Sequence, residues 1–72
     1  MDIDIKIGEQ LAHLRKSKGF TQEQLASILD LHEDYISKIE RGLRSPSVKT
    51  LLLILDKLEV KYSYFFASLE SN

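Results

Sequence analysis

The amino-acid sequence predicts a compact all-α fold of five helices in a single domain over residues 1–72. Apolar residues recur three and four positions apart along much of the chain, which is the spacing of one face of an α-helix. Capping residues and glycines separate these segments. The stretch from Phe20 to Gly42, FTQEQLASILDLHEDYISKIERG, twice shows an apolar residue, a capping position and an apolar residue four further on. This spacing fixes the angle at which a chain enters a helix, so it predicts two short helices joined by a tight turn.

The first helix is expected over about residues 4–18, with Gly19 ending it. The isoleucines near the start alternate as in a strand, but a longer helical series continues from them. The residues on this helical face are Ile3, Ile7, Leu11 and Leu14. Gly8 within the helix costs about 1 kcal/mol relative to alanine, so either close packing or simple tolerance is expected there.

Two capped helices are expected next, over about residues 21–29 and 33–41. Thr21 and Gln24 have the spacing of a capping box at the start of the first. Gly42 ends the second. The residues expected to be buried are Leu25, Ala26, Leu29, Ile36 and Ile39.

The last two helices follow a loop over residues 43–47. Pro46 disfavours helix before it, and Ser47 is a good cap for a fourth helix. The run LLLIL could be a strand by itself, but its length and cap favour a helix, and a fifth helix is expected around 62–70. The core residues expected in this half are Leu51, Ile54, Leu55, Leu58, Val60 and Phe65.

Composition excludes several classes of protein. The 72 residues contain no cysteine and no apolar run near the roughly 20 residues of a membrane span. The amino end lacks the basic start and apolar stretch of a signal peptide. We therefore expect a soluble cytoplasmic protein without a membrane partner. A domain of this size buries only about 60% of its unfolded surface, which favours self-association.

Signals for catalysis and for cofactors are lacking. The two histidines, His13 and His32, lie nineteen positions apart, and no glycine-rich phosphate loop occurs. We expect no catalytic residues, no metal site, no cofactor and no small-molecule ligand. The remaining possibilities are binding functions.

Charge is unevenly distributed although the net charge is −1. Four cations fall within twelve residues whose only acid is Glu40, and we call them the basic strip. The basic strip consists of Lys38, Arg41, Arg44 and Lys49. Such a local concentration of cations is compatible with a nucleic-acid partner, even in a chain that is neutral overall.

Three segments, TQEQLASIL, YISKIERG and PSVKTLLLI, resemble the helix-turn-helix domain of the lambda-repressor and Cro type, also called the XRE family. The resemblance covers about residues 7–66. It implies a compact five-helix lambda-repressor-like DNA-binding domain with its helix-turn-helix at 21–41. It also implies a homodimeric transcriptional regulator on a roughly palindromic operator in double-stranded DNA, with the third helix in the major groove. Small phage or mobile-element repressors and restriction–modification controller proteins are both similar at this length.

Candidate base contacts lie on the third helix. Glu33 and Asp34 occupy positions where the family usually places base-reading side chains, and a carboxylate there could accept a hydrogen bond from cytosine. Alternatively, the two acids only complement the helix dipole. Ser37 and Lys38 lie one turn further along, on the face opposite the inward isoleucines.

Candidate contacts to the DNA backbone surround this helix. They are Thr21, Gln22, Tyr35, Arg41, Arg44, Ser47 and Lys49. The alternatives are an ordinary surface position for Gln22, packing against the following loop for Tyr35, and a solvated basic face for the cations. The resemblance further implies a structural ion pair between Arg15 and Glu40 that orients the third helix.

Surplus apolar residues in the region of about 50–70 are candidates for a dimer interface. They are Leu53, Tyr62, Tyr64 and Phe66. An exposed apolar patch marks an interface, although Phe66 and one tyrosine could instead complete the core. The rival to a DNA-binding regulator is a protein-interaction module or an antitoxin with the same fold and weak or no DNA binding. The acidic pair on the third helix and the neutral total charge favour that rival.

Overall fold

The computed structural model describes residues 2–70 and contains five helices in that range. The helices are α1 (Ile3–Ser17), α2 (Gln22–Leu29), α3 (Glu33–Glu40), α4 (Val48–Lys57) and α5 (Tyr62–Glu70). No strand occurs between residues 2 and 70, and the all-α prediction is confirmed. The predicted bounds are wrong by one residue in places. α1 begins and ends one residue earlier than predicted, and Thr21 and Arg41 are cap residues rather than helical ones.

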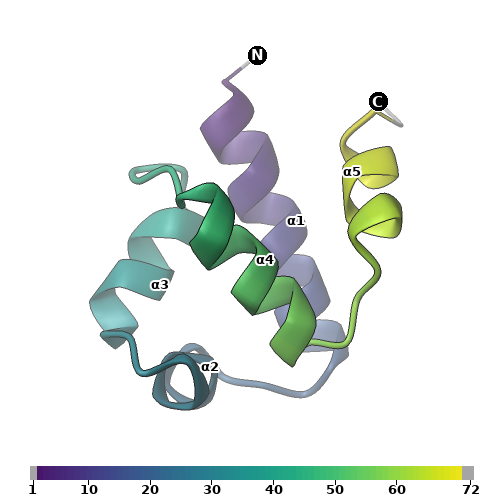
Figure 1. Cartoon of the computed structure of the whole chain (residues 1–72). Helices are drawn as coiled ribbons and strands as arrows, with labels where there is room; N and C mark the ends of the chain where they lie inside the picture. Colours follow the sequence, from purple (N-terminus) through teal and green to yellow (C-terminus); the bar gives the residue numbers. More distant parts are fainter. Residues whose placement is uncertain (1, 71–72) are drawn as a thin grey trace.

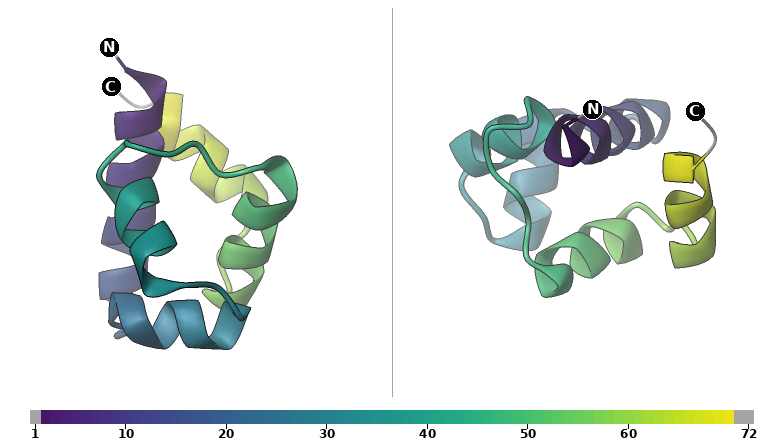
Figure 2. Two further views of the ribbon diagram at one scale, coloured as in Figure 1. Left: turned by 90° about the vertical axis from the view of Figure 1, so that its left-hand side faces the viewer. Right: turned by 90° about the horizontal axis from the view of Figure 1, so that it is seen from above.

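The helices enclose one apolar core, with α3 and α5 on opposite sides of the molecule (Figures 1 and 2). α1 contacts α3 and α5, whereas α2 contacts α3 and α4. The buried apolar residues are Leu11, Leu14, Leu25, Ala26, Ile36, Ile39, Leu51, Ile54, Leu55, Leu58, Val60 and Phe65. Ile3 was expected on the inner face of α1 but is 56% exposed, because the first turn of α1 extends past the neighbouring helices (Figure 1).

Local capping explains where the short helices begin and end. Thr21 accepts a hydrogen bond from the Gln24 backbone N–H, and the Gln24 side chain accepts one from the Thr21 N–H, which completes the predicted capping box. Ser47 caps α4 by accepting from the Thr50 N–H at 3.1 Å. Asp30 and Gly42 take left-handed conformations, with φ of 57° and 77°, after α2 and α3.

Two glycines allow α1 to approach α3 closely. A Cβ on Gly8 would collide with the Ile39 carbonyl oxygen and lie 2.7 Å from that of Glu40. At Gly42 a Cβ would lie 2.6 Å from the side chain of Ile5. Of the two explanations for Gly8, close packing is therefore the correct one, and α3 is held directly against α1.

Among residues 2–70, no helix is both long enough and apolar enough to cross a bilayer.

Candidate nucleic-acid interface

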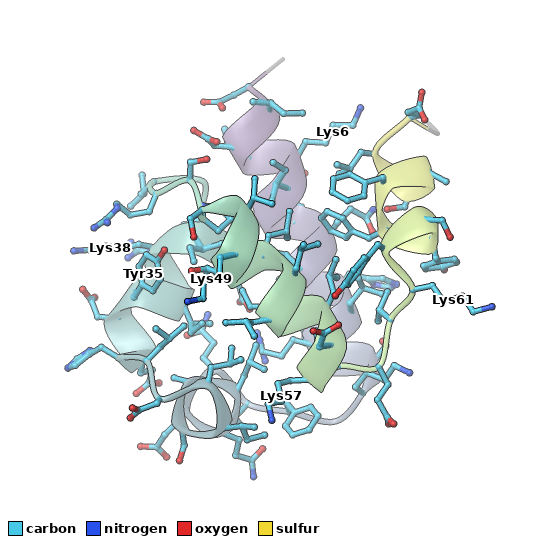
Figure 3. The ribbon with its side chains drawn as sticks, viewed as in Figure 1. Lys6, Tyr35, Lys38, Lys49, Lys57 and Lys61 are labelled. Carbon is cyan, nitrogen blue, oxygen red and sulfur yellow. The ribbon has the colours of Figure 1, made fainter. Side chains whose placement is uncertain are left out.

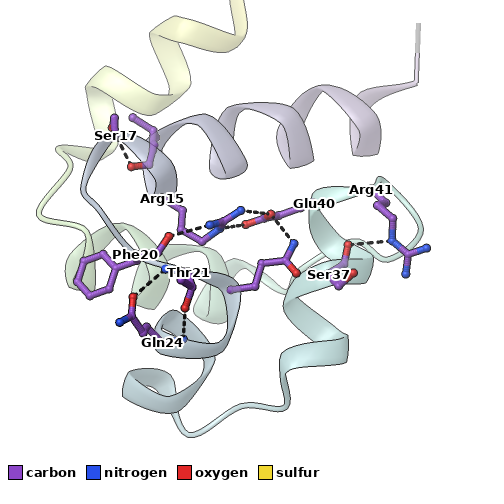
Figure 4. A network of polar contacts seen from close by, with 10 residues as sticks. Arg15, Ser17, Phe20, Thr21, Gln24, Ser37, Glu40 and Arg41 are labelled. Atoms are coloured by element: carbon purple, nitrogen blue, oxygen red, sulfur yellow. Dashed lines mark hydrogen bonds and ion pairs between the residues drawn. The ribbon is translucent and has the colours of Figure 1, made fainter.

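The carboxyl end of α3 is held by Arg15 of α1 (Figure 4) and by Gln22 of α2. Arg15 donates to Glu40 through Nε at 2.6 Å and through Nη2 at 2.9 Å. Its Nη1 donates to the Phe20 carbonyl oxygen at 2.7 Å. Both charged side chains are only 7% exposed, and this ion pair joins α1 directly to α3.

Gln22 adds a third element to this network. Its Nε2 donates to Glu40 Oε1 at 2.8 Å, so one carboxylate oxygen accepts from both Arg15 and Gln22. The sequence analysis predicts that Gln22 contacts the DNA backbone. In the structure, its side-chain amide nitrogen points towards α3 and donates to Glu40. Gln22 is the first residue of α2, not the second as the predicted helix start implied. The network therefore fixes the orientation of α2 and α3 relative to one another.

The outer face of α3 carries the four candidate base contacts. Ile36 and Ile39 are buried on the inner face. Glu33 and Asp34 are exposed in the first turn, and Ser37 and Lys38 follow in the second. His32 caps the helix, because its Nδ1 accepts a hydrogen bond from the Asp34 backbone N–H at 3.2 Å.

Asp34 and Lys38 form an ion pair on this outer face. Lys38 Nζ lies 3.0 Å from Asp34 Oδ2, with the two residues one helical turn apart. The hydrogen bond from Lys38 and its positive charge lower the pKa of the Asp34 carboxyl below its usual value. Asp34 is thus held as a carboxylate whose charge is matched by a neighbouring ammonium group.

Tyr35 and Arg44 connect α3 to the loop that follows it. The guanidinium carbon of Arg44 lies 5.3 Å from the centre of the Tyr35 ring, a cation–π arrangement. Tyr35 is half-buried and packs against the core, while Arg44 is exposed. The tyrosine ring therefore lies against a side chain of the loop and holds Arg44 next to α3, and a DNA contact by Tyr35 stays a prediction.

The cations of the basic strip lie on one side of the molecule. Lys38, Lys49 and Tyr35 are on the α3 side, whereas Lys6, Lys57 and Lys61 lie elsewhere (Figure 3). Arg41 is exposed at the end of α3, and its Nε donates to the Ser37 carbonyl oxygen at 3.4 Å. Thr21 and Ser47 are N-cap residues at the starts of α2 and α4. The structure thus brings the basic strip alongside the outer face of α3.

The predicted interface residues, three of them on α5 and one on α4, are all exposed. Leu53 of α4 is followed one turn later by Asp56, which accepts a hydrogen bond from the Tyr62 hydroxyl at 2.6 Å. This bond raises the pKa of Tyr62. Phe66 follows Tyr62 by four residues and shares its side of α5. We call Leu53, Tyr62 and Phe66 the α4–α5 patch.

Tyr64 lies elsewhere on α5, beside Leu14 and Lys18 at the end of α1.

Two of these contacts were missed from the sequence. The bond from Gln22 to Glu40 joins residues 18 positions apart, and nothing in their spacing indicates that they meet. The Asp34–Lys38 pair has the (i, i+4) spacing of a helical ion pair, which was a sufficient signal to predict it.

Two short helices at a fixed angle, with the second exposing a polar face beside a basic strip, define a helix-turn-helix domain. Residues 11–65 match the helix-turn-helix family, and the chain belongs to that family. The HTH-type transcriptional regulator RP497 of Rickettsia prowazekii (strain Madrid E) is 37% identical over 68 residues, or 94% of this chain. The chain spans about half of that relative, 52% of its length.

Control proteins are among the similar chains. Control protein C.SmaI of Serratia marcescens is 36% identical over 58 residues, which cover 81% of this chain and 69% of that protein. The restriction–modification controller protein C.Esp1396I, solved as a tetramer in complex with its natural 35 base-pair operator, superposes with a TM-score of 0.86. It is 38% identical, and the match covers 97% of this chain and 92% of that one.

Proposed function

We propose that this protein is a sequence-specific regulator of transcription that binds double-stranded DNA as a homodimer. α3 would lie in the major groove of each half of a roughly palindromic operator, with its amino end towards the base edges. The observation that carries the proposal is the exposed polar face of α3, held rigidly by Arg15, Gln22 and Glu40 beside the basic strip. The similarity to a controller protein solved on its operator supports it.

The contacts divide into two groups by chemistry. On the outer face of α3, Glu33, Asp34, Ser37 and Lys38 would face base edges. Around it, the residues that would contact phosphates are Thr21, Gln22, Tyr35, Arg41, Arg44, Ser47 and Lys49. Gln22 can serve both roles, because its side-chain nitrogen carries two N–H groups. One donates to Glu40, and the other, like the backbone N–H, can donate to a phosphate oxygen.

The α4–α5 patch would join the two copies within the region of about residues 50–70, each contributing the same surface about a two-fold axis. Regulation by protein concentration through dimerisation would then need no ligand. The family membership supports a binding function without catalysis, in the cytoplasm, and among regulators the controller type is favoured by the similar chains.

A salt titration tests DNA binding. We expect the affinity for the DNA upstream of the protein's own gene to fall steeply between about 50 and 200 mM salt, with a log–log slope near −0.9 per phosphate contacted. Fluorescence anisotropy of a labelled duplex measures it. A flat response, or no binding at low salt, would favour the protein-interaction module or antitoxin instead.

A matched pair of lysine variants localises the surface. Lys49→Ala should weaken binding to every duplex alike and reduce the salt slope by about one. Lys61→Ala removes the same charge on the α5 side of the molecule (Figure 3), so its slope should equal that of the wild type. Equal losses in the two variants would show that the basic strip is not the binding surface.

A further inference from the structure

The Asp34–Lys38 pair places a hydrogen-bond acceptor and a hydrogen-bond donor side by side on the outer face of α3. Asp34 Oδ2 and Lys38 Nζ are 3.0 Å apart, and their side chains are 59% and 42% exposed. The long lysine side chain reaches back towards the amino end of the helix, so its ammonium group lies level with Asp34. Both groups are therefore available to a ligand at the same time.

A single base pair offers the complementary arrangement in the major groove. In a C·G pair the cytosine N4 amino group is a donor, and guanine O6 and N7 are acceptors. N4 and O6 are hydrogen-bonded to one another, so they are about 2.9 Å apart. An acceptor and a donor held 3.0 Å apart can thus face a donor and an acceptor with the same separation.

We propose that Asp34 and Lys38 together recognise one C·G base pair in each half of the operator. Asp34 accepts a hydrogen bond from cytosine N4, and Lys38 donates one to guanine O6 or N7. The proposal rests on the proposed function, because α3 must lie in the major groove. It identifies Asp34, an acidic residue on a DNA-binding face, as a residue that determines specificity.

Electrostatics favours the pair over either residue alone. An isolated carboxylate near the DNA backbone is repelled by the phosphates, whereas a carboxylate paired with an ammonium group carries no net charge into the groove. The side chain of its neighbour Glu33 makes no hydrogen bond or ion pair in the described part of the chain. The two acids at the start of α3 are therefore not equivalent.

Orientation and base identity follow from the same geometry. G·C and T·A pairs present the donor and the acceptor in the reverse order, so they do not match the arrangement of Asp34 and Lys38. An A·T pair keeps the order, from adenine N6 to thymine O4, but it offers Lys38 one acceptor instead of two, beside the thymine methyl group. The expected order of affinity at this position is C·G first, A·T second, and the two reversed pairs last.

The test begins with selection of bound duplexes from a random DNA library, followed by affinity measurements on four duplexes that differ at one base pair. Wild-type protein should prefer C·G at one position of each half-site by about tenfold or more over the reversed pairs. Asp34→Ala and Lys38→Ala should abolish the preference at that same position. Lys38→Ala should also bind every duplex more weakly than the double variant, because it leaves an unmatched carboxylate.

Glu23→Ala is the matched control, since Glu23 is an exposed carboxylate in the first turn of α2 and is not among the proposed DNA contacts. Its loss should leave this preference intact. Circular dichroism checks that each variant is folded. If an alanine variant is not folded, Asp34→Asn or Lys38→Met is measured in its place. Loss of preference at two different positions, or additive effects in the double variant, would overturn the proposal. Failure of the wild type to bind DNA would instead overturn the proposed function.

Discussion

Arg15 shows how a single buried charge can define the position of a helix. Its guanidinium group is satisfied by Glu40 and by the Phe20 carbonyl oxygen, and no buried side-chain nitrogen or oxygen in the described part of the chain lacks a partner. A buried ion pair adds little net stability, because both charges lose their hydration. Loss of one partner is costly, however, and the pair therefore penalises any arrangement in which α1 and α3 are misaligned.

His32 is a weak N-cap, and its replacement should improve local stability. It caps α3 with a ring nitrogen 3.2 Å from the Asp34 N–H, whereas serine is among the preferred N-cap residues. We expect His32→Ser to raise the free energy of unfolding by about 0.5–1 kcal/mol. The midpoint of denaturant-induced unfolding measures the change.

His13→Ser is the control for that substitution, because His13 is exposed in the middle of α1. Serine and histidine have similar helix propensities, so this change should stay within about 0.5 kcal/mol of the wild type. If His32→Ser lowered the free energy of unfolding, the imidazole would stabilise the fold through more than its hydrogen bond with the Asp34 N–H.

At the scale of the helices, signals near in sequence predicted the structure and distant contacts did not. Capping residues and apolar spacing act within one or two turns, so they placed α1, α2, α3, α5 and the start of α4 to within a residue. Whether a face is covered depends on the neighbouring helices, which is why Ile3 was wrongly placed inside. The contact of Gln22 with Glu40 and the position of Tyr64 beside Leu14 were not predicted for the same reason: what a polar or aromatic side chain contacts on another helix is not encoded in its spacing.

Gly8 offers a prediction about the packing of α1 on α3. Alanine in place of a glycine within a helix normally stabilises it by about 1 kcal/mol. Here the added Cβ would collide with the α3 backbone at Ile39 and Glu40. We therefore expect the opposite sign for Gly8→Ala, a loss of about 1–3 kcal/mol, as is usual for overpacking.

Thermal and denaturant unfolding measure this loss, and Glu9→Ala serves as the control. Glu9 is the next residue of the same helix and is exposed, so its change should lie within about 0.5 kcal/mol. A stabilised Gly8→Ala variant would mean that α1 can move away from α3 at little cost.

At the scale of the whole molecule, the two proposed interfaces share only α4, with Lys49 in its first turn and Leu53 further along, and they do not compete. α3 is on one side of the core and α5 on the other (Figure 1). The molecule measures 31 × 24 × 21 Å. Recognition helices of a dimer must be about 34–36 Å apart to enter successive major grooves on one face of DNA. Two molecules of this size, joined away from α3, are of the right scale to meet that spacing.

The dimer itself can be tested with two substitutions of the same kind. Leu53 in the α4–α5 patch and Ile28 on α2 are both 43% exposed aliphatic residues on helices. Leu53→Glu would place a charge in the proposed interface, where it would lose its hydration without gaining a partner. We expect it to sediment as a monomer at concentrations at which Ile28→Glu and the wild type sediment as dimers.

The same variants connect assembly to DNA binding. A monomer contacts one half-site, so Leu53→Glu should lose at least tenfold in affinity for a two-half-site duplex, while its affinity for a single half-site should match the wild type. Tyr64→Glu then shows whether the interface continues around α5 towards the end of α1. If Leu53→Glu remained a dimer and Tyr64→Glu did not, the copies would meet through the surface beside Leu14 and Lys18 instead of the α4–α5 patch.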